Sequence, residues 1–264
     1  MSDLSTPERR RVARLGGISL RLPTMDDPWK WLSLGWRDLW RTPAFSLGYG
    51  LAFVVIGLAG TAGMWLVGAE SLVPVVAAGF ALLGPILAVG LYEISRRQEQ
   101  GLPIALRDIV YVHVAAPVQL AFMAFFLMFI YLVWVRAATL LFALFVYDNF
   151  MPLSKIVAFV LTTPQGIAMM VIGTAIGLCL ALVTFAISAL SIPILMRKDV
   201  DVMTAMSASV EVAMRAAGPM LLWAWLVAVL TAFGIASMFL GLIVVFPLIG
   251  HATWHAYRSI VGED

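Results

Sequence analysis

The sequence has few charged residues, and this scarcity excludes a soluble protein of its length. Only 12% of the 264 residues are charged, whereas 62% are hydrophobic, and the mean hydropathy is +0.98. A soluble domain carries about twice that share of charge, because water must hydrate its surface. The apolar residues come in runs of the length that crosses a hydrocarbon core, about 20 helical residues. We therefore predict an integral membrane protein.

Cysteine is almost absent, since Cys179 is the only one and lies within an apolar run. This excludes a disulfide within the chain, a CxxC redox motif and a cysteine-based zinc site. The first 44 residues are polar and basic and lack a short apolar core with a cleavage site, so we expect no secretory signal in them. The net charge is only +2, and the basic residues form no continuous stripe, so we expect no nucleic-acid binding.

Six apolar stretches predict an all-α, polytopic membrane bundle with six transmembrane helices. Four extend from about Phe45 to Gly68, Leu72 to Tyr92, Ala115 to Trp134 and Gly166 to Ile192, and a last tract covers residues 219–257. That tract would be roughly 60 Å long as one straight helix, so it must fold back on itself. The break is expected around "FGIASMFLG", where Gly234, Ser237 and Gly241 weaken helix propensity. The spans then form three helical hairpins.

The positions of Lys and Arg predict the orientation of these spans. With the amino terminus inside, 15 basic residues fall on the cytoplasmic side and only Arg136 and Lys155 fall outside. The inside set is Arg9, Arg10, Arg11, Arg14, Arg21, Lys30, Arg37, Arg41, Arg96, Arg97, Arg107, Arg197, Lys198, Arg215 and Arg258. By the positive-inside rule we expect both termini in the cytoplasm.

A repeated pattern appears when the spans are aligned by topology. An amphipathic stretch that ends at a proline precedes each odd span: "WKWLSLGWRDLWRTP", "PIALRDIVYVHVAAP" and "VMTAMSASVEVAMRAAGP". Each even span carries a proline, namely Pro85, Pro193 and Pro247. Eleven residues separate Pro85 from Arg96 and also Pro247 from Arg258, whereas Arg197 follows Pro193 by only four. The pattern predicts an interfacial helix and a hairpin, used three times.

The first amphipathic stretch, about residues 29–41, predicts a helix that lies in the headgroup layer. Its apolar face consists of Trp29, Leu32, Trp36, Leu39 and Trp40, and its polar face of Lys30, Ser33, Arg37 and Arg41. Tryptophan and basic residues arranged in this way are typical of interfacial helices. We therefore expect Trp29, Trp36 and Trp40 to anchor a cytoplasmic segment, residues 1–44. The six-span domain then covers residues 45–258, and a cytoplasmic tail covers residues 259–264.

The spans themselves contain almost no ionisable group. Ion-coupled transporters and proton relays place such groups in the membrane, so a proton-coupled carrier or a pore for charged substrates is disfavoured. Small residues stand out instead: Gly173 and Gly177 form a GxxxG pair, and Gly57 and Gly60 lie along the first span. We expect these glycines to pack helices within the bundle, with a dimer interface as the alternative. Between residues 137 and 163 we expect one or two short helices on the outer face.

His251 and His255 lie on one face of the last predicted helix, the spacing of zinc-binding pairs. The HExxH glutamate is missing, and two histidines of one helix cannot bind haem from opposite sides. His113 is the only candidate for a haem ligand that approaches from the opposite side. We expect a polar cluster instead, in which His251 binds Glu93 or a backbone carbonyl near Tyr92, while His255 and Arg258 reach the interface. No catalytic residue, metal ligand or cofactor is assigned.

The stretches "PLIGHATWHAYR", "GWRDLWRTP", "GPILAVGLYEISRR" and "FAISALSIPILMRKDVDVMTAM" resemble a bacterial family of predicted integral membrane proteins, domain of unknown function 2189. The resemblance extends from about residue 28 to 258. It implies six spans and a bacterial inner-membrane location, and it supplies no catalytic residues.

Three classes of function follow from these patterns. The leading hypothesis is a non-enzymatic membrane protein that scaffolds, assembles or regulates other membrane components, or that handles lipid. Its expected partners are membrane lipids and either another membrane protein or a second copy of the chain. The alternative is a transporter or permease for an apolar or zwitterionic small molecule. A haem or metal redox protein is the third class.

Overall fold

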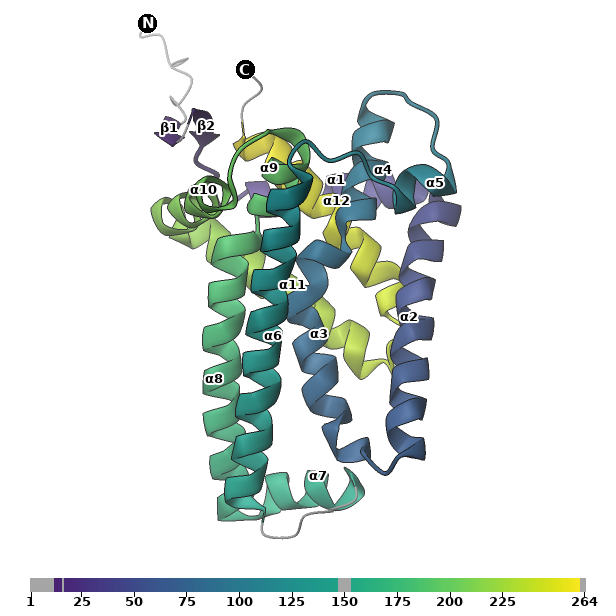
Figure 1. Cartoon of the computed structure of the whole chain (residues 1–264), viewed down its shortest axis with the longest axis vertical. Coiled ribbons are helices and arrows are strands. Elements are labelled where there is room, and N and C mark those ends of the chain that lie inside the picture. Colours follow the sequence, from purple (N-terminus) through teal and green to yellow (C-terminus); the bar gives the residue numbers. More distant parts are fainter. Residues whose placement is uncertain (1–11, 16, 147–152, 262–264) are drawn as a thin grey trace, which may run out of the picture.

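The computed structural model describes residues 12–15, 17–146 and 153–261, and the chain is mostly helical (Figure 1). In chain order the elements are β1 (Val12–Leu15), β2 (Ile18–Arg21), α1 (Asp27–Arg41), α2 (Pro43–Leu66), the 3-10 helix η1 (Glu70–Leu72), α3 (Val73–Leu87), α4 (Val89–Glu99), α5 (Leu106–Val110), α6 (Pro117–Phe145), α7 (Leu153–Thr162), α8 (Pro164–Ser188), α9 (Ser191–Arg197), α10 (Val202–Arg215), α11 (Ala217–Ala236) and α12 (Leu242–Ile260). The antiparallel pair β1–β2 corrects the all-α expectation.

The short elements gather at one end of the long helices, which we call the capped end. Figure 1 shows β1, β2, α1, α4, α5, α9 and α10 there, whereas α7 lies across the opposite end. An isolated bridge between Leu20 and Val261 joins β2 to the residue after α12. The three predicted amphipathic stretches correspond to α1, α5 and α10, although α5 is only five residues long. Pro43 and Pro117 begin α2 and α6, where a missing N–H costs nothing.

The structure does not confirm six spans. Within the described residues, four helical segments are long and apolar enough to cross a membrane: Pro43–Leu66, Pro117–Phe145, Pro164–Arg197 and Ala217–Ala236. A fifth is obtained if Glu70–Gly79 and Ala81–Leu87 count as one span bent by 50°. The sixth predicted span coincides with α12, which is not among these segments because its second half is polar.

The helix of the third predicted span is longer than expected. Arg136 does not end it, since α6 continues to Phe145. Arg136 lies 19 residues after Pro117, about 28 Å along the axis, so its exposed side chain is close to the far boundary of a 30 Å core. The short helix expected beyond it corresponds to α7. Residues 147–152 of that expected region lie outside the described residues.

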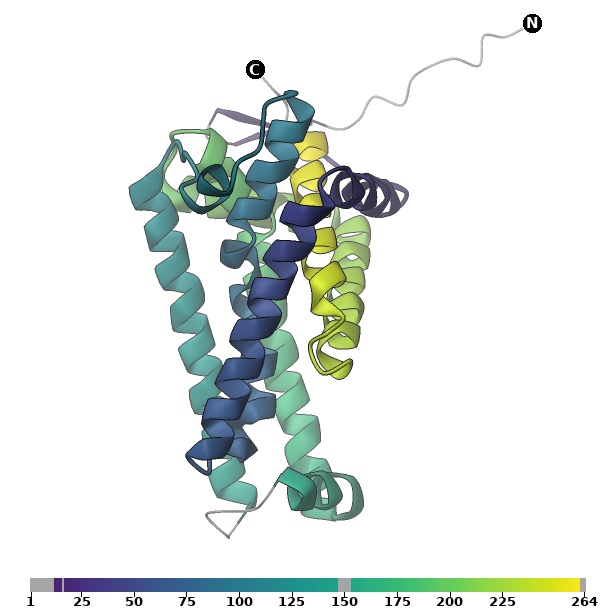
Figure 2. The ribbon, with the colours of Figure 1, turned by 90° about the vertical axis from the view of Figure 1, so that its right-hand side faces the viewer.

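The last tract folds back where the sequence predicted. Residues 237–241 connect α11 to α12, and Met238 and Phe239 adopt positive φ angles of 55° and 67°. A Cβ on Gly234 would lie 2.5 Å from the Leu242 side chain, so this glycine lets the two helices approach. In Figure 2 the connection lies well short of the opposite end that α2, α6 and α8 reach.

Helix α1 has two apolar faces, of which the sequence pattern revealed one. Trp29, Trp36 and Trp40 are 54%, 48% and 51% exposed, as anchors in a headgroup layer would be. The other face packs against the bundle through Trp31 and Gly35, and Leu39, which the sequence pattern placed with the exposed tryptophans, is also buried. Trp31 is 2% exposed, contacts Trp223 edge to face and donates a hydrogen bond to Ser259. Trp31 therefore fastens α1 to α11 and α12.

The glycines predicted to pack helices have different surroundings. A Cβ on Gly177 would lie 3.0 Å from Trp134 and one on Gly173 would lie 3.6 Å from Leu141, so both face α6 of the same chain. Gly57 lies near the Phe239 ring, whereas nothing is within 4 Å of a Cβ on Gly60. The face of Gly173 and Gly177 is therefore used for packing within the chain.

Candidate functional site

Helix α12 is the centre of the capped end. It contacts α1, α2, α4 and α11, and most of its second half is buried. Three glycines allow these contacts to be close. A Cβ on Gly35 would lie 2.7 Å from the Ala252 nitrogen, one on Gly50 would overlap the Ile243 carbonyl, and one on Gly250 would lie 2.6 Å from the Leu91 side chain. These close approaches bring α12 against α1, α2 and α4, where polar side chains of the four helices meet.

His251 is completely buried and uses both ring nitrogens. Its Nε2 lies 2.9 Å from the Ser46 hydroxyl of α2, and its Nδ1 lies 2.7 Å from the Ser95 hydroxyl of α4. Both serines are also fully buried. The structure thus corrects the expected carboxylate partner, because Glu93 does not bind His251. An interhelical hydrogen bond does form, and its partners are two hydroxyls.

A second histidine extends this network to α1. His255 Nε2 lies 2.7 Å from Asp38 Oδ2, and the Asp38 side chain is only 3% exposed. Burial raises the pKa of Asp38. The hydrogen bond and the charge of His255, together with a hydrogen bond from Ser95, lower it by more than burial raises it, so the pKa lies below the ordinary value. Asp38 is therefore a carboxylate at neutral pH. We name Asp38, Ser46, Ser95, His251 and His255 the histidine clasp.

The proton positions in the clasp follow from the ionised state of Asp38. An ionised carboxylate only accepts hydrogen bonds, so the Ser95 hydroxyl donates to Asp38. The oxygen of Ser95 then accepts from Nδ1–H of His251. In a neutral imidazole with this Nδ1 proton, Nε2 is unprotonated and accepts from the Ser46 hydroxyl. Each donor meets an acceptor. Because the serines are sealed from solvent, this arrangement joins α1, α2, α4 and α12 and offers no exposed nucleophile.

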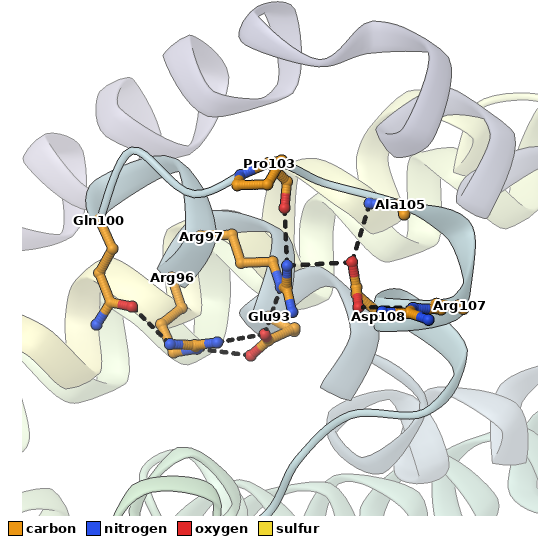
Figure 3. Close-up of polar contacts among 8 residues, drawn as sticks. All are labelled: Glu93, Arg96, Arg97, Gln100, Pro103, Ala105, Arg107 and Asp108. Atoms are coloured by element: carbon orange, nitrogen blue, oxygen red, sulfur yellow. Dashed lines mark hydrogen bonds and ion pairs between the residues drawn. The ribbon is translucent and has the colours of Figure 1, made fainter.

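Glu93 forms a separate ionic cluster (Figure 3). It accepts from Arg96 Nε at 2.7 Å and from Arg97 Nε at 2.8 Å. Arg97 also donates to the Pro103 carbonyl at 2.7 Å and pairs with Asp108 at 3.1 Å. These contacts hold the loop after α4 against that helix. A carboxylate that is 2% exposed is thereby neutralised by two guanidinium groups.

The other predicted members of the polar cluster lie apart from the clasp. Arg258 was expected to reach the interface, and it also forms an ion pair, since its Nε lies 3.1 Å from Glu99 Oε1. Tyr92 is buried in the hydrophobic core. His113 is exposed, between α5 and α6. The structure brings His251 and His255 onto one network and does not add Glu93, Tyr92, Arg258 or His113 to it.

The histidine pair has the spacing of zinc ligands but lacks a third ligand in the described residues. Across residues 12–15, 17–146 and 153–261 no group of three His, Cys, Asp or Glu side chains is placed to hold an ion. The geometry accounts for the histidines in another way, because three of their four ring nitrogens already have protein partners.

Sequence reasoning missed the partners of the histidines. Ser46 and Ser95 are small polar residues in apolar surroundings and carry no motif. Asp38 had a weak signal: Trp31, Gly35 and Asp38 follow each other at helical spacing on the side of α1 away from the exposed tryptophans. An acidic residue on that second stripe could have been expected to bind a buried partner.

The long apolar helices define the class to which the chain belongs, an integral membrane protein. Its sequence from residue 72 to residue 197 matches the family of predicted integral membrane proteins known as domain of unknown function 2189. The matched segment contains "GPILAVGLYEISRR" and extends through α9, whereas the expected resemblance in α1 and α12 lies outside it. Neither the curated proteins nor the solved structures contain a match.

Proposed function

We propose that the chain is a non-enzymatic protein of the bacterial inner membrane that handles lipid or helps to assemble, scaffold or regulate other membrane components. In this proposal both termini and the capped end are cytoplasmic. The lysines and arginines of α1, α4, α5, α9, α10 and α12 support this orientation, since Figure 1 places those elements, or their basic ends, at the capped end. Arg136 and Lys155 are near the opposite end.

The distribution of burial carries the proposal. Only 11% of the apolar window of α6 and 6% of that of Pro164–Arg197 is buried, so most residues of these windows keep surface that is available to lipid or another protein. Most of the buried side chains belong to the capped end, where the clasp is sealed. A chain with this much apolar surface is suited to binding within the membrane.

An apolar groove supports the lipid-handling form of this function. A partly open cavity of about 190 Å³ lies between α2, α3 and the α11–α12 connection. Ile56, Gly57, Gly60, Val76 and Phe239 are among its lining residues, and Gly57 and Gly60 leave the space that a larger side chain would fill. A lipid acyl chain has the shape and polarity for this groove.

The same groove keeps a transporter for an apolar molecule as the second candidate. It lies beside the 50° bend between Glu70–Gly79 and Ala81–Leu87, and a bent helix can change its angle. His251 and His255 do not support a haem or metal redox function, because three of their four ring nitrogens are hydrogen-bonded to Ser46, Ser95 and Asp38.

Reconstitution into liposomes distinguishes these candidates. The protein, purified in a mild detergent, is analysed by native mass spectrometry for retained phospholipid and then reconstituted for flux of small apolar and zwitterionic solutes. We expect retained lipid, no solute flux above protein-free liposomes, and no chemical change in the lipids. Saturable solute flux would favour the transporter instead, and a lipid product that accumulates with time would contradict the non-enzymatic assignment.

A further inference from the structure

Three arginines from three different helices meet at one cavity of the capped end. Arg96 lies in the last turn of α4, Arg197 ends α9, and Arg258 lies in the last turn of α12. Together with Glu99, Gln100 and Trp254 they line a mostly polar cavity of about 180 Å³. We call it the arginine pocket. One water needs about 15 Å³ by the same kind of measure, so the pocket has room for a polyatomic ion.

Two of the three arginines, Arg96 and Arg258, correspond to one another in the sequence repeat. All three follow the proline of an even predicted span, by eleven residues for Arg96 and Arg258 and by four for Arg197. The contact between α4 and α12 and their contacts with α9 bring these separate positions together. The arginine pocket is thus built from separate parts of the chain, and no single local motif creates it.

The pocket carries more positive than negative charge. Its lining has three guanidinium groups and one carboxylate, that of Glu99. Glu99 accepts from Arg258 Nε at 3.1 Å and from Trp254 Nε1 at 3.3 Å. Arg96 binds Glu93 and donates to Gln100. Arg197 is exposed, and the described part of the chain provides it with no hydrogen bond or ion pair.

We infer that the arginine pocket binds a phosphate group. Guanidinium donors match phosphate oxygens in pairs, and Arg197 has all of its donors available. Arg258 and Arg96 add positive charge from the other walls. Trp254 forms a wall with an apolar ring and one N–H, as is common at the level of lipid headgroups. The phosphate can come from an anionic phospholipid or from solution; only the lipid source rests on the proposed lipid-handling function.

Two binding measurements on the full chain test this inference. Native mass spectrometry compares adducts of phosphatidylglycerol with those of phosphatidylcholine, and calorimetry titrates inorganic phosphate against the detergent-purified protein. Arg197→Gln is the informative variant, because the described part of the chain gives the exposed Arg197 side chain no hydrogen bond or ion pair to lose. We expect it to weaken binding of the preferred probe about tenfold, the loss of one charged hydrogen bond. Arg197→Lys should weaken it less.

Arg107→Gln is the matched control, since its side chain is 87% exposed at the same end and does not line the pocket. If the parent prefers phosphatidylglycerol, if Arg197→Gln removes this preference, and if inorganic phosphate does not displace the bound lipid, the ligand is a lipid headgroup. Displacement by inorganic phosphate assigns phosphate from solution. Equal binding of both probes by the parent, Arg197→Gln and Arg107→Gln would overturn the inference. Solute flux in liposomes would contradict the proposed function and leave this result unaffected.

Discussion

At the scale of single residues, the histidine clasp is the feature with the clearest physical consequence. His251 is surrounded by protein on all sides, and its two ring nitrogens are saturated by Ser46 and Ser95. A buried polar atom without a partner costs about 1–3 kcal/mol, so removing the imidazole affects the hydroxyls as well as the ring. The clasp therefore stabilises the meeting point of four helices only while all of its members are present.

Replacing His251 by Leu is expected to destabilise the protein. The variant fills a similar volume but leaves the hydroxyls of Ser46 and Ser95 without their common partner, at a cost of about 1–3 kcal/mol. The measurement is thermal unfolding in detergent. His113→Leu serves as the control, because His113 is exposed and should leave the midpoint unchanged.

Metal analysis of the same samples provides a second readout. We expect neither the parent nor His251→Leu to contain stoichiometric iron, copper or zinc. Metal present in the parent and lost in the variant would show that His251 is a ligand, and the clasp would then be the wrong description.

At the scale of elements, the packing of α1 on α12 holds the capped end together. Gly35 lies where the two helix backbones meet, with a Cβ position only 2.7 Å from the Ala252 nitrogen and 2.9 Å from the Leu248 oxygen. Neither backbone atom can move without shifting its helix. The same contact places Asp38 beside His255 one turn further along α1, so packing and the polar network depend on one geometry.

Gly35→Ala is expected to push α1 away from α12 and to lower stability by about 1–3 kcal/mol, the usual cost of overpacking. Thermal unfolding and the protease sensitivity of α1 measure the effect. Gly48→Ala is the control: nothing lies within 4 Å of its Cβ position, so better helix propensity should make it neutral or slightly stabilising. Equal midpoints for both variants would mean that the α1–α12 contact is not close in solution.

At the scale of the whole molecule, the connection between α11 and α12 lies at an unexpected depth. Phe239 contacts Gly57, which is about 21 Å along α2 from Pro43 and still nine residues before Leu66. Figure 2 shows the same relation, because the α11–α12 pair is shorter than the helices beside it. In a membrane aligned with α2, this connection would lie within the hydrocarbon region.

This depth leads to a labelling prediction. In a Cys179→Ala background, cysteines introduced at Ser71 and Lys155 should react with a membrane-impermeant maleimide added from outside, whereas a cysteine at Ser237 should be protected. Cysteines at Lys198 and Arg258 should react only after the membrane is opened. Rapid labelling of Ser237 from outside would restore the six-span arrangement, in which this residue reaches the outer surface.

Several features could be predicted from the sequence because they depend on local composition. Long apolar runs indicate membrane helices wherever they pack, and Pro43 and Pro117 mark helix starts because proline fits the first turn. The tryptophans of α1 are exposed as expected, since an amphipathic pattern needs only the period of one helix. Gly234, Ser237 and Gly241 likewise located the connection after α11.

The partners of the histidines and the depth of α12 were decided by tertiary structure alone. Ser46 and Ser95 are 205 and 156 residues away from His251 in the chain, and no spacing rule connects such distant positions. Hydropathy predicted a spanning helix for α12, but hydropathy does not record whether the polar second half of a helix is covered by protein. Gly35 and Gly250 allow α1 and α4 to approach this half closely, and only the assembled helices reveal which glycines do so.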